Sequence, residues 1–177
     1  MDMSEWTQEA FNDVVKKHQE LAIKDEKYVF SIFRKIDNKN IGYVDFSTIM
    51  RNKFQWGLIS YRLHNQFWRK GYGKEAVKEA LHIAFKNLHF HRIEAHINLD
   101  NTASIHLAES VGMKFECIRE KFIYEFGGWT DNLIYYMNAK SFLNVFDLKS
   151  KFKWLGFSLS KHILIKTVPC CHMERLQ

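Results

Sequence analysis

The sequence predicts an α+β fold of three layers, in which a mixed and mainly antiparallel sheet carries helices on its faces. Segments with helical periodicity alternate along the chain with runs of β-branched and aromatic residues, and turn residues join two pairs of these runs into hairpins. The order is helix, hairpin, strand, helix, strand, helix, hairpin. A chain of 177 residues, 46% of them hydrophobic, is long enough for one domain with a sizeable core.

The first third of the chain predicts one helix and three strands. Ser4 has the chemistry of an N-cap, and residues 27–36 and 41–49 predict a hairpin around the turn sequence at residues 37–40. Residues 54–63 predict a third strand. The helix that follows Ser4 has one apolar face, formed by Trp6, Ala10, Phe11, Val14, Val15, Leu21 and Ala22.

The following elements alternate between helix and strand. Residues 92–99 predict a short strand, and residues 102–110 predict a helix that ends at Gly112. Residues 115–126 and 130–137 predict a final hairpin around two adjacent glycines. Before these, residues 73–88 predict a helix, because apolar side chains recur at helical spacing at Ala76, Val77, Ala80, Leu81, Ala84, Phe85 and Leu88.

A turn with two glycines joins the third strand to this helix and has the composition of a phosphate-binding turn. Gly71 and Gly73 let the backbone approach a ligand closely, and the first N–H groups of the helix point toward it. Arg69, Lys70 and Lys74 add positive charge around the same turn.

The same glycines also satisfy the dinucleotide-binding pattern G-x-G-x-x-G/A, with Ala76 in the last position and the acidic Glu94 further along the chain. That pattern needs a buried strand that ends directly at the first glycine. A polar and aromatic loop, residues 65–70, stands there instead. The flanking residues therefore disfavour a dinucleotide site.

Four segments in collinear order resemble the GNAT N-acetyltransferases, and among them the RimJ/RimL-like branch that acetylates the N-termini of ribosomal proteins. The resemblance covers residues 4–140 and implies an acetyl-CoA-dependent N-acetyltransferase with a GNAT-like sheet. Its acceptor would be the α-amino group of a protein or, alternatively, a small amine such as a polyamine or aminoglycoside. The four segments are residues 59–76, 91–95, 101–115 and 127–137.

The resemblance implies where coenzyme A would bind. Its pyrophosphate would lie on the glycine turn, its pantetheine arm would run beside the strand that ends at Leu63, and the amide of Asn101 would hold that arm. Asn101 could equally be the N-cap of the helix that follows it, and both roles are compatible. Trp68 is typical of the ribosomal-protein branch. The cofactor-binding residues expected on this basis are Tyr61, Arg62, Leu63, Trp68, Arg69, Lys70, Gly71, Tyr72, Gly73, Lys74 and Asn101.

Acetyl transfer also needs a base for the amine and a group that stabilises the leaving thiolate. Glu94 and His96 share one face of a predicted strand, and family members often carry an acidic base at one of these positions, so we assign the base to the two jointly. The alternative to a catalytic role is that Glu94 only forms an ion pair and that His96 only has a structural role. For the leaving thiolate, many GNAT enzymes use a tyrosine at the position where this chain has Ala108. The RimL-like branch uses a serine instead, and its equivalent here is Ser104. The alternative is that Ser104 has only a structural role at the start of a helix.

Neither a metal site nor a disulfide framework is predicted. His89, His91 and His96 straddle a helix-to-strand turn without a recognised ligand set, and the adjacent cysteines at 170 and 171 lack ligand spacing. The N-terminus has no apolar leader, and no apolar run is long enough to cross a bilayer. We therefore expect a cytoplasmic protein with reduced cysteines and no DNA partner.

Both ends of the chain depart from the family pattern. The resemblance implies a strand and a helix before the helix at Ser4, so we expect the sheet to lack its first strand and the acceptor site to lack a wall. The chain would then be a shortened enzyme, a homodimer that completes the site in trans, or a catalytically silent coenzyme-A-binding module.

Residues 141–177 form a basic C-terminal extension that the resemblance does not cover. Much of the net charge of +6 lies there, because six lysines and arginines accompany only two acidic residues. A packed extension that covers the missing sheet edge is one interpretation. A helix that contacts a membrane surface or RNA is the other.

Overall fold

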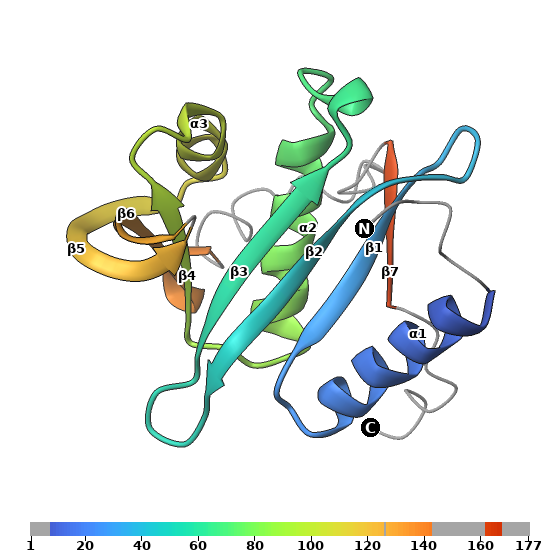
Figure 1. Cartoon of the computed structure of the whole chain (residues 1–177), viewed down its shortest axis with the longest axis horizontal. Coiled ribbons are helices and arrows are strands. Elements are labelled where there is room, and N and C mark those ends of the chain that lie inside the picture. Colours follow the sequence, from blue (N-terminus) through green and yellow to red (C-terminus); the bar gives the residue numbers. More distant parts are fainter. Residues whose placement is uncertain (1–7, 126, 143–161, 168–177) are drawn as a thin grey trace.

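The computed structural model describes residues 8–125, 127–142 and 162–167 of the chain (Figure 1). The predicted order of helices and strands is present, with one further strand near the C-terminal end. The elements are α1 (Gln8–Ile23), β1 (Tyr28–Arg34), β2 (Lys39–Met50), β3 (Trp56–Leu63), the short 3-10 helix η2 (Asn65–Phe67), α2 (Tyr72–Lys86), β4 (Arg92–Asn98), α3 (Thr102–Ser110), β5 (Lys114–Glu125), β6 (Gly128–Asn138) and β7 (Ile163–Thr167).

The strands form one seven-stranded sheet in the order β5-β6-β4-β3-β2-β1-β7. Among the described strands, only β3 and β4 pair in parallel. Helix α2 lies behind the centre of the sheet, whereas α1 lies on the other face near β1 (Figure 1). The predicted fold class, a mixed and mainly antiparallel sheet flanked by helices, is therefore confirmed.

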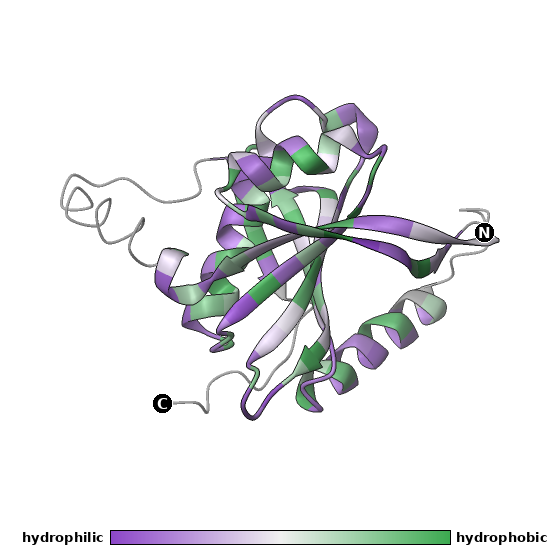
Figure 2. Cartoon of the chain, turned by 90° about the vertical axis from the view of Figure 1, so that its left-hand side faces the viewer, coloured by the Kyte–Doolittle hydropathy of each residue, from purple (hydrophilic) through white to green (hydrophobic). Residues whose placement is uncertain are grey.

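The main core fills the space between the sheet and α2. Alternating side chains of β4 face opposite sides, and Ile93, Ala95 and Ile97 pack into a cluster that includes Val77 and Leu81 of α2. Figure 2 shows this mixture of hydrophobic and hydrophilic residues along the strands. The side chains of β4 on the opposite face are Arg92, Glu94, His96 and Asn98.

Strands β3 and β4 pair only over a short stretch and then separate (Figure 1). Gly57 lies in the paired stretch, where an added Cβ would come within 2.9 Å of the Phe90 ring, so the packing of Phe90 on this stretch depends on glycine. Beyond Leu58 of β3 and Glu94 of β4 the two strands have no further register pairs. The backbone edges that follow are therefore available to a ligand.

The first residues of the predicted N-terminal helix and most of the predicted C-terminal extension are not part of the described structure. The predicted N-cap Ser4, together with Trp6, lies outside the described residues, and Val14 of the predicted apolar face is exposed. The described part of the chain contains no helix that is long and apolar enough to span a membrane.

Strand β7 comes from the predicted C-terminal extension and forms the edge of the sheet beside β1. It pairs antiparallel with β1, from Phe30 opposite Thr167 to Arg34 opposite Ile163. Ile163 is fully buried against Ile32, Ile41, Phe67 and Ala76. Residues 163–167 are therefore a packed part of the same sheet, whereas a domain boundary at residue 140 stays a prediction.

We expect Ile163→Ala to lower the free energy of unfolding by about 2–5 kcal/mol, because it leaves a cavity in a fully buried cluster. Urea denaturation measures this change. Leu164→Ala is the matched control, since the neighbouring side chain is 41% exposed and should cost much less. Equal losses in the two variants would contradict the packing of β7 described here.

Candidate active site

The turn before α2 has the backbone geometry of an anion site. Gly71 is the N-cap of the helix with φ of 82°, and no side chain caps the helix there. Glu75 is the first residue whose N–H bonds back to the Gly71 carbonyl, at 3.2 Å. The N–H groups of Tyr72, Gly73 and Lys74 thus have no intrahelical acceptor. A Cβ added at Gly71 would meet nothing within 4 Å, so the turn is open to a ligand.

The buried side chain of Phe67 anchors this turn to the rest of the protein. Phe67 of η2 is buried, and the cationic groups of Arg34 and Lys70 lie 5.0 and 5.9 Å from its ring centre. Trp68 is exposed, but its indole N–H donates to the Leu63 carbonyl at 2.9 Å. The turn is therefore anchored by one buried ring while its charged residues face outward.

The helix after the turn approaches α3 closely. A Cβ at Gly73 would lie 3.3 Å from Leu107 of α3 and 3.6 Å from Leu63, so a larger residue would push the two elements apart. The two predicted glycines thus have different roles. Gly71 supplies a left-handed backbone and open space, while Gly73 permits close packing.

Backbone groups of β3 point into the split between β3 and β4. The His64 N–H donates to Ile41 of β2 at 3.0 Å. Because backbone groups alternate sides along a strand, those of Tyr61 and Leu63 face the split and those of Arg62 face β2. By the same alternation the backbone of Ile59 also faces the split, and a contact of Arg62 with the pantetheine arm stays a prediction.

Helix α3 forms the other wall of the split. The side-chain oxygen of Asn101 accepts from the Ser104 N–H at 3.1 Å and caps the helix. The Tyr61 hydroxyl crosses from β3 and donates to the Ser104 carbonyl at 3.3 Å. Burial raises the pKa of Tyr61, so this hydroxyl stays protonated and bridges the two walls. Asn101, Ser104 and Tyr61, all predicted site residues, are thereby brought together.

Glu94 and His96 are in contact on the face of β4 that lies opposite α2. The Nε2 atom of His96 lies 3.0 Å from Oε2 of Glu94, and Arg92 Nε donates to Oε1 at 2.7 Å. A second guanidinium, that of Arg119 on β5, lies 3.6 Å from the same carboxylate. Glu94 is only 4% exposed, so these partners compensate a charge that water does not reach.

These contacts keep Glu94 ionised. Burial opposes ionisation, but hydrogen bonds with His96, Arg92 and Trp56 lower the pKa of Glu94 from 4.5 to about 2. Because its pKa is lower in the folded state, the ionised carboxylate stabilises the fold above about pH 4.5, and this contribution is lost as the pH falls toward 2. A carboxylate held in this way accepts a proton only weakly near neutral pH.

Two aromatic side chains enclose His96. The ring centre of Phe122 lies 5.3 Å from that of His96, and the ring centre of Trp56 lies 6.4 Å away. Neither these rings nor Arg92 and Arg119 were predicted as site residues. The sequence signal for Arg92 and Trp56 was their position at the start of two adjacent strands. Phe122 and Arg119 had no such signal, because they lie beside a bulge in β5 that the sequence does not indicate.

The described residues contain no group of three histidine, cysteine, aspartate or glutamate side chains that could hold a metal ion. His96 instead contacts a carboxylate and two aromatic rings. The arrangement combines an anion-binding turn, a split strand edge and a histidine–carboxylate pair.

This fold and site define an acetyltransferase of the GNAT class. A family model described as the acetyltransferase (GNAT) domain matches residues 2–114, more than half of the chain. The chain therefore belongs to the GNAT acetyltransferase family, and the resemblance of the four collinear segments is confirmed.

Relatives and solved structures agree with this assignment. The probable N-acetyltransferase YjcK of Bacillus subtilis is 34% identical over 129 residues, which are 73% of this chain and 71% of that protein. The ribosomal-protein-S5-alanine acetyltransferase of Vibrio fischeri superposes with a TM-score of 0.70 at 25% identity, covering 80% of this chain and 78% of that chain. The RimJ/RimL-like character of the chain is thus confirmed, and the chain is an N-acetyltransferase.

One further structure shares the fold. The spermidine N-acetyltransferase of Vibrio cholerae, solved in complex with CoA and spermine, has a TM-score of 0.66 at 19% identity. The superposition covers 81% of this chain and 82% of that chain. Enzymes named for protein and for polyamine acceptors therefore share this architecture.

Gly71→Val should abolish the binding of acetyl-CoA, because the new side chain fills the open space over the turn. Isothermal titration calorimetry measures the loss. Gly127→Val is the matched control: Gly127 has φ of 84° and equally open surroundings, so the backbone strain is similar but lies in the β5–β6 turn. Wild-type affinity in Gly71→Val would contradict this position for the pyrophosphate.

Proposed function

We propose that this chain transfers an acetyl group from acetyl-CoA to the N-terminal α-amino group of a protein, such as a ribosomal protein. The observation that supports this most is the split between β3 and β4, which has an anion-binding turn at its open end and the Glu94–His96 pair near its paired end. Similarity to an enzyme named for ribosomal protein S5 supports the acceptor class. We also infer a cytoplasmic location, where ribosomal proteins are available.

The residues of the split fit acetyl-CoA along its length. The N–H groups of the first turn of α2 would bind the pyrophosphate, with Arg69, Lys70 and Lys74 adding mobile positive charge. The backbone edge at Tyr61 and Leu63 would pair with the amides of the pantetheine arm. Trp68 would flank the arm. The cap of α3 uses only the side-chain oxygen of Asn101, so its NH₂ group retains donors for a pantetheine carbonyl.

In the reaction, the acceptor nitrogen bonds to the acetyl carbonyl carbon while the bond from that carbon to sulfur breaks. Backbone N–H groups of β3 that face the split would stabilise the negative charge that develops on the carbonyl oxygen. The Ser104 hydroxyl would donate a hydrogen bond to the departing thiolate, and the Ser104 backbone already lies at the wall of the split that Tyr61 contacts.

We assign the base to His96 and a positioning role to Glu94. The carboxylate faces Nε2 of His96, so a neutral imidazole that donates its Nε2 proton to Glu94 has Nδ1 as its proton acceptor. Nδ1 would take the proton of the acceptor amine, directly or through a water molecule. An α-amino group has a reference pKa of about 7.7–8.0, so it needs less help to lose this proton than a lysine does.

A small-molecule amine is the alternative acceptor, because a spermidine N-acetyltransferase shares the fold. A homodimer that completes the site in trans also stays a prediction. The two acceptor classes predict different rates with the same set of substrates, which makes them separable by experiment.

Purified protein with acetyl-CoA should release free thiol fastest with N-terminal peptides of ribosomal proteins, and slower with spermidine or an aminoglycoside. A thiol-reactive dye measures the rate, and mass spectrometry identifies the acetylated nitrogen. A higher kcat/KM with spermidine would favour the small-molecule alternative. Binding of acetyl-CoA without turnover of any acceptor would identify a silent module and contradict the proposal.

His96→Gln should lower kcat by about 100-fold or more, the usual contribution of a general base. Glu94→Gln should cause a smaller loss, because the amide can still accept the Nε2 proton of His96 through its oxygen. With a pKa of about 2, Glu94 stays ionised near neutral pH, so Glu94→Gln should not change the pH dependence of kcat/KM in that range. A larger loss of kcat in Glu94→Gln than in His96→Gln would make Glu94 the base.

A further inference from the structure

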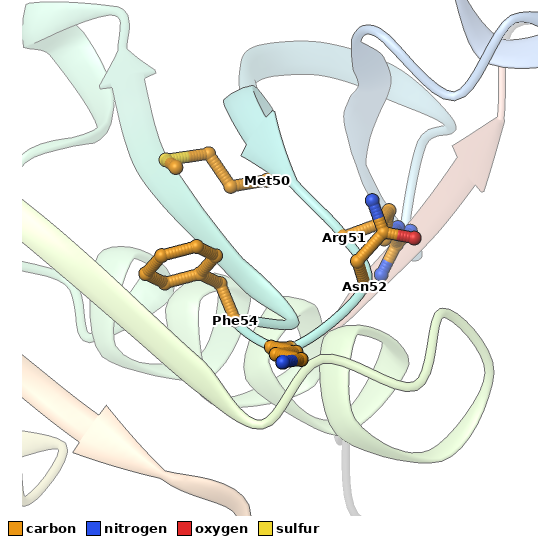
Figure 3. A pocket seen from close by; sticks show the side chains of 5 residues that line it. Met50, Arg51, Asn52 and Phe54 are labelled. Atoms are coloured by element: carbon orange, nitrogen blue, oxygen red, sulfur yellow. The ribbon is translucent and has the colours of Figure 1, made fainter.

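A pocket of about 400 Å³ lies at the loop between β2 and β3. Met50 and Phe54 are 44% and 61% exposed, although both are large apolar side chains. Figure 3 shows them on one side of the loop, with Arg51 and Asn52 directed to the other side. The residues that line the pocket are Met50, Arg51, Asn52, Lys53 and Phe54.

Hydrogen bonds of Arg51 hold the loop that carries these side chains in place. The Arg51 guanidinium donates to both oxygens of Asp25, at 2.5 and 2.6 Å, and to the Leu88 carbonyl at 2.9 Å. It also lies 4.1 Å from the centre of the Phe90 ring, which belongs to the main core. The exposed apolar pair is therefore presented by a rigid turn, which lowers the entropic cost of binding a ligand there.

The pocket lies next to the proposed acceptor face. Met50 pairs with Trp56 across β2 and β3, and Trp56 pairs with Arg92 across β3 and β4, so these side chains project from one face of the sheet. The Trp56 indole then extends to within 6.4 Å of the His96 ring, measured between ring centres. An apolar path thus leads from Phe54 and Met50 over Trp56 to the predicted base.

The charges along this path do not suit a polycation. Glu94 is bonded to Arg92 and Arg119, and Glu116 to Arg92. These two carboxylates are thus paired with arginines, and the residues that line the pocket include no acidic side chain. Lys53 contributes a further positive charge to the rim of the pocket. A polyamine needs uncompensated carboxylates along its length, whereas a peptide with an apolar side chain does not.

Resting on the proposed function, we propose that Met50 and Phe54, with Trp56 beside them, bind an apolar side chain close to the N-terminus of a peptide acceptor. Met50 lies in register with Trp56 and Arg92, so the way to His96 crosses two strand spacings of about 4.8 Å and runs four residues along β4, roughly 16 Å in all. An extended peptide covers about 3.4 Å per residue, and the side chains that meet in the pocket shorten the remaining gap. A side chain at the third to fifth position of the acceptor can therefore reach the pocket while the α-amino group lies at His96.

The test compares two acceptor peptides that differ only in a leucine or a serine at the third residue, with spermidine as a third substrate. We expect wild-type kcat/KM to be about tenfold higher for the leucine peptide, the scale of discrimination that an apolar pocket provides. Phe54→Ser should remove most of this preference and leave the serine peptide unchanged. Phe115→Ser is the matched control, since Phe115 is 51% exposed and packs on Tyr135 on the far side of the sheet.

Each outcome of this experiment has a distinct meaning. Equal rates for the two peptides in the wild type, or a preference that survives in Phe54→Ser, would overturn the pocket assignment and leave the proposed function intact. A higher kcat/KM for spermidine than for either peptide would overturn the peptide acceptor itself. Unchanged acetyl-CoA affinity in both variants, measured by calorimetry, would show that the loss concerns the acceptor alone.

Discussion

The short parallel contact between β3 and β4 is the constraint on which the rest of the structure depends. Parallel strands normally continue their ladder, but here pairing ends after Leu58 and Glu94. The unpaired edge that results would be unfavourable in an isolated protein, because backbone groups without partners lose hydrogen bonds. The fold keeps the edge open by bracing its walls through Tyr61 and the start of α3, so that a ligand with amide groups can take the place of a strand.

The two faces of β4 have different roles. Its apolar side chains pack on α2 and hold the strand in place, while its polar side chains form a nearly buried ionic cluster on the other face. A carboxylate that is shielded from water is costly unless several donors surround it. Arg92, Arg119 and His96 supply these donors, so the same contacts that keep Glu94 charged also fix the orientation of the imidazole.

Much of this architecture could be predicted from local patterns, and the parts that could not depend on distant contacts. Helix α3 begins and ends where Asn101 and Gly112 predicted, because capping is decided by a few adjacent residues. The roles within the Glu94–His96 pair stayed open, since the pKa of Glu94 depends in part on Trp56, which comes from a strand that is remote in sequence. A packed extension at the sheet edge was only one of two interpretations of the C-terminal segment, because the strand that pairs with β7 lies near the other end of the chain.

Strand β7 has a consequence for how the protein is made. Its residue Ile163 completes the cluster that holds Phe67 beneath the glycine turn, yet it is synthesised long after every other member of that cluster. While the ribosome is still translating, β1 has a vacant edge and the cluster has a gap, and such exposed edges favour wrong pairing. The edge of β1 and the cluster beneath the glycine turn are therefore completed only after β7 has been made and has left the ribosome.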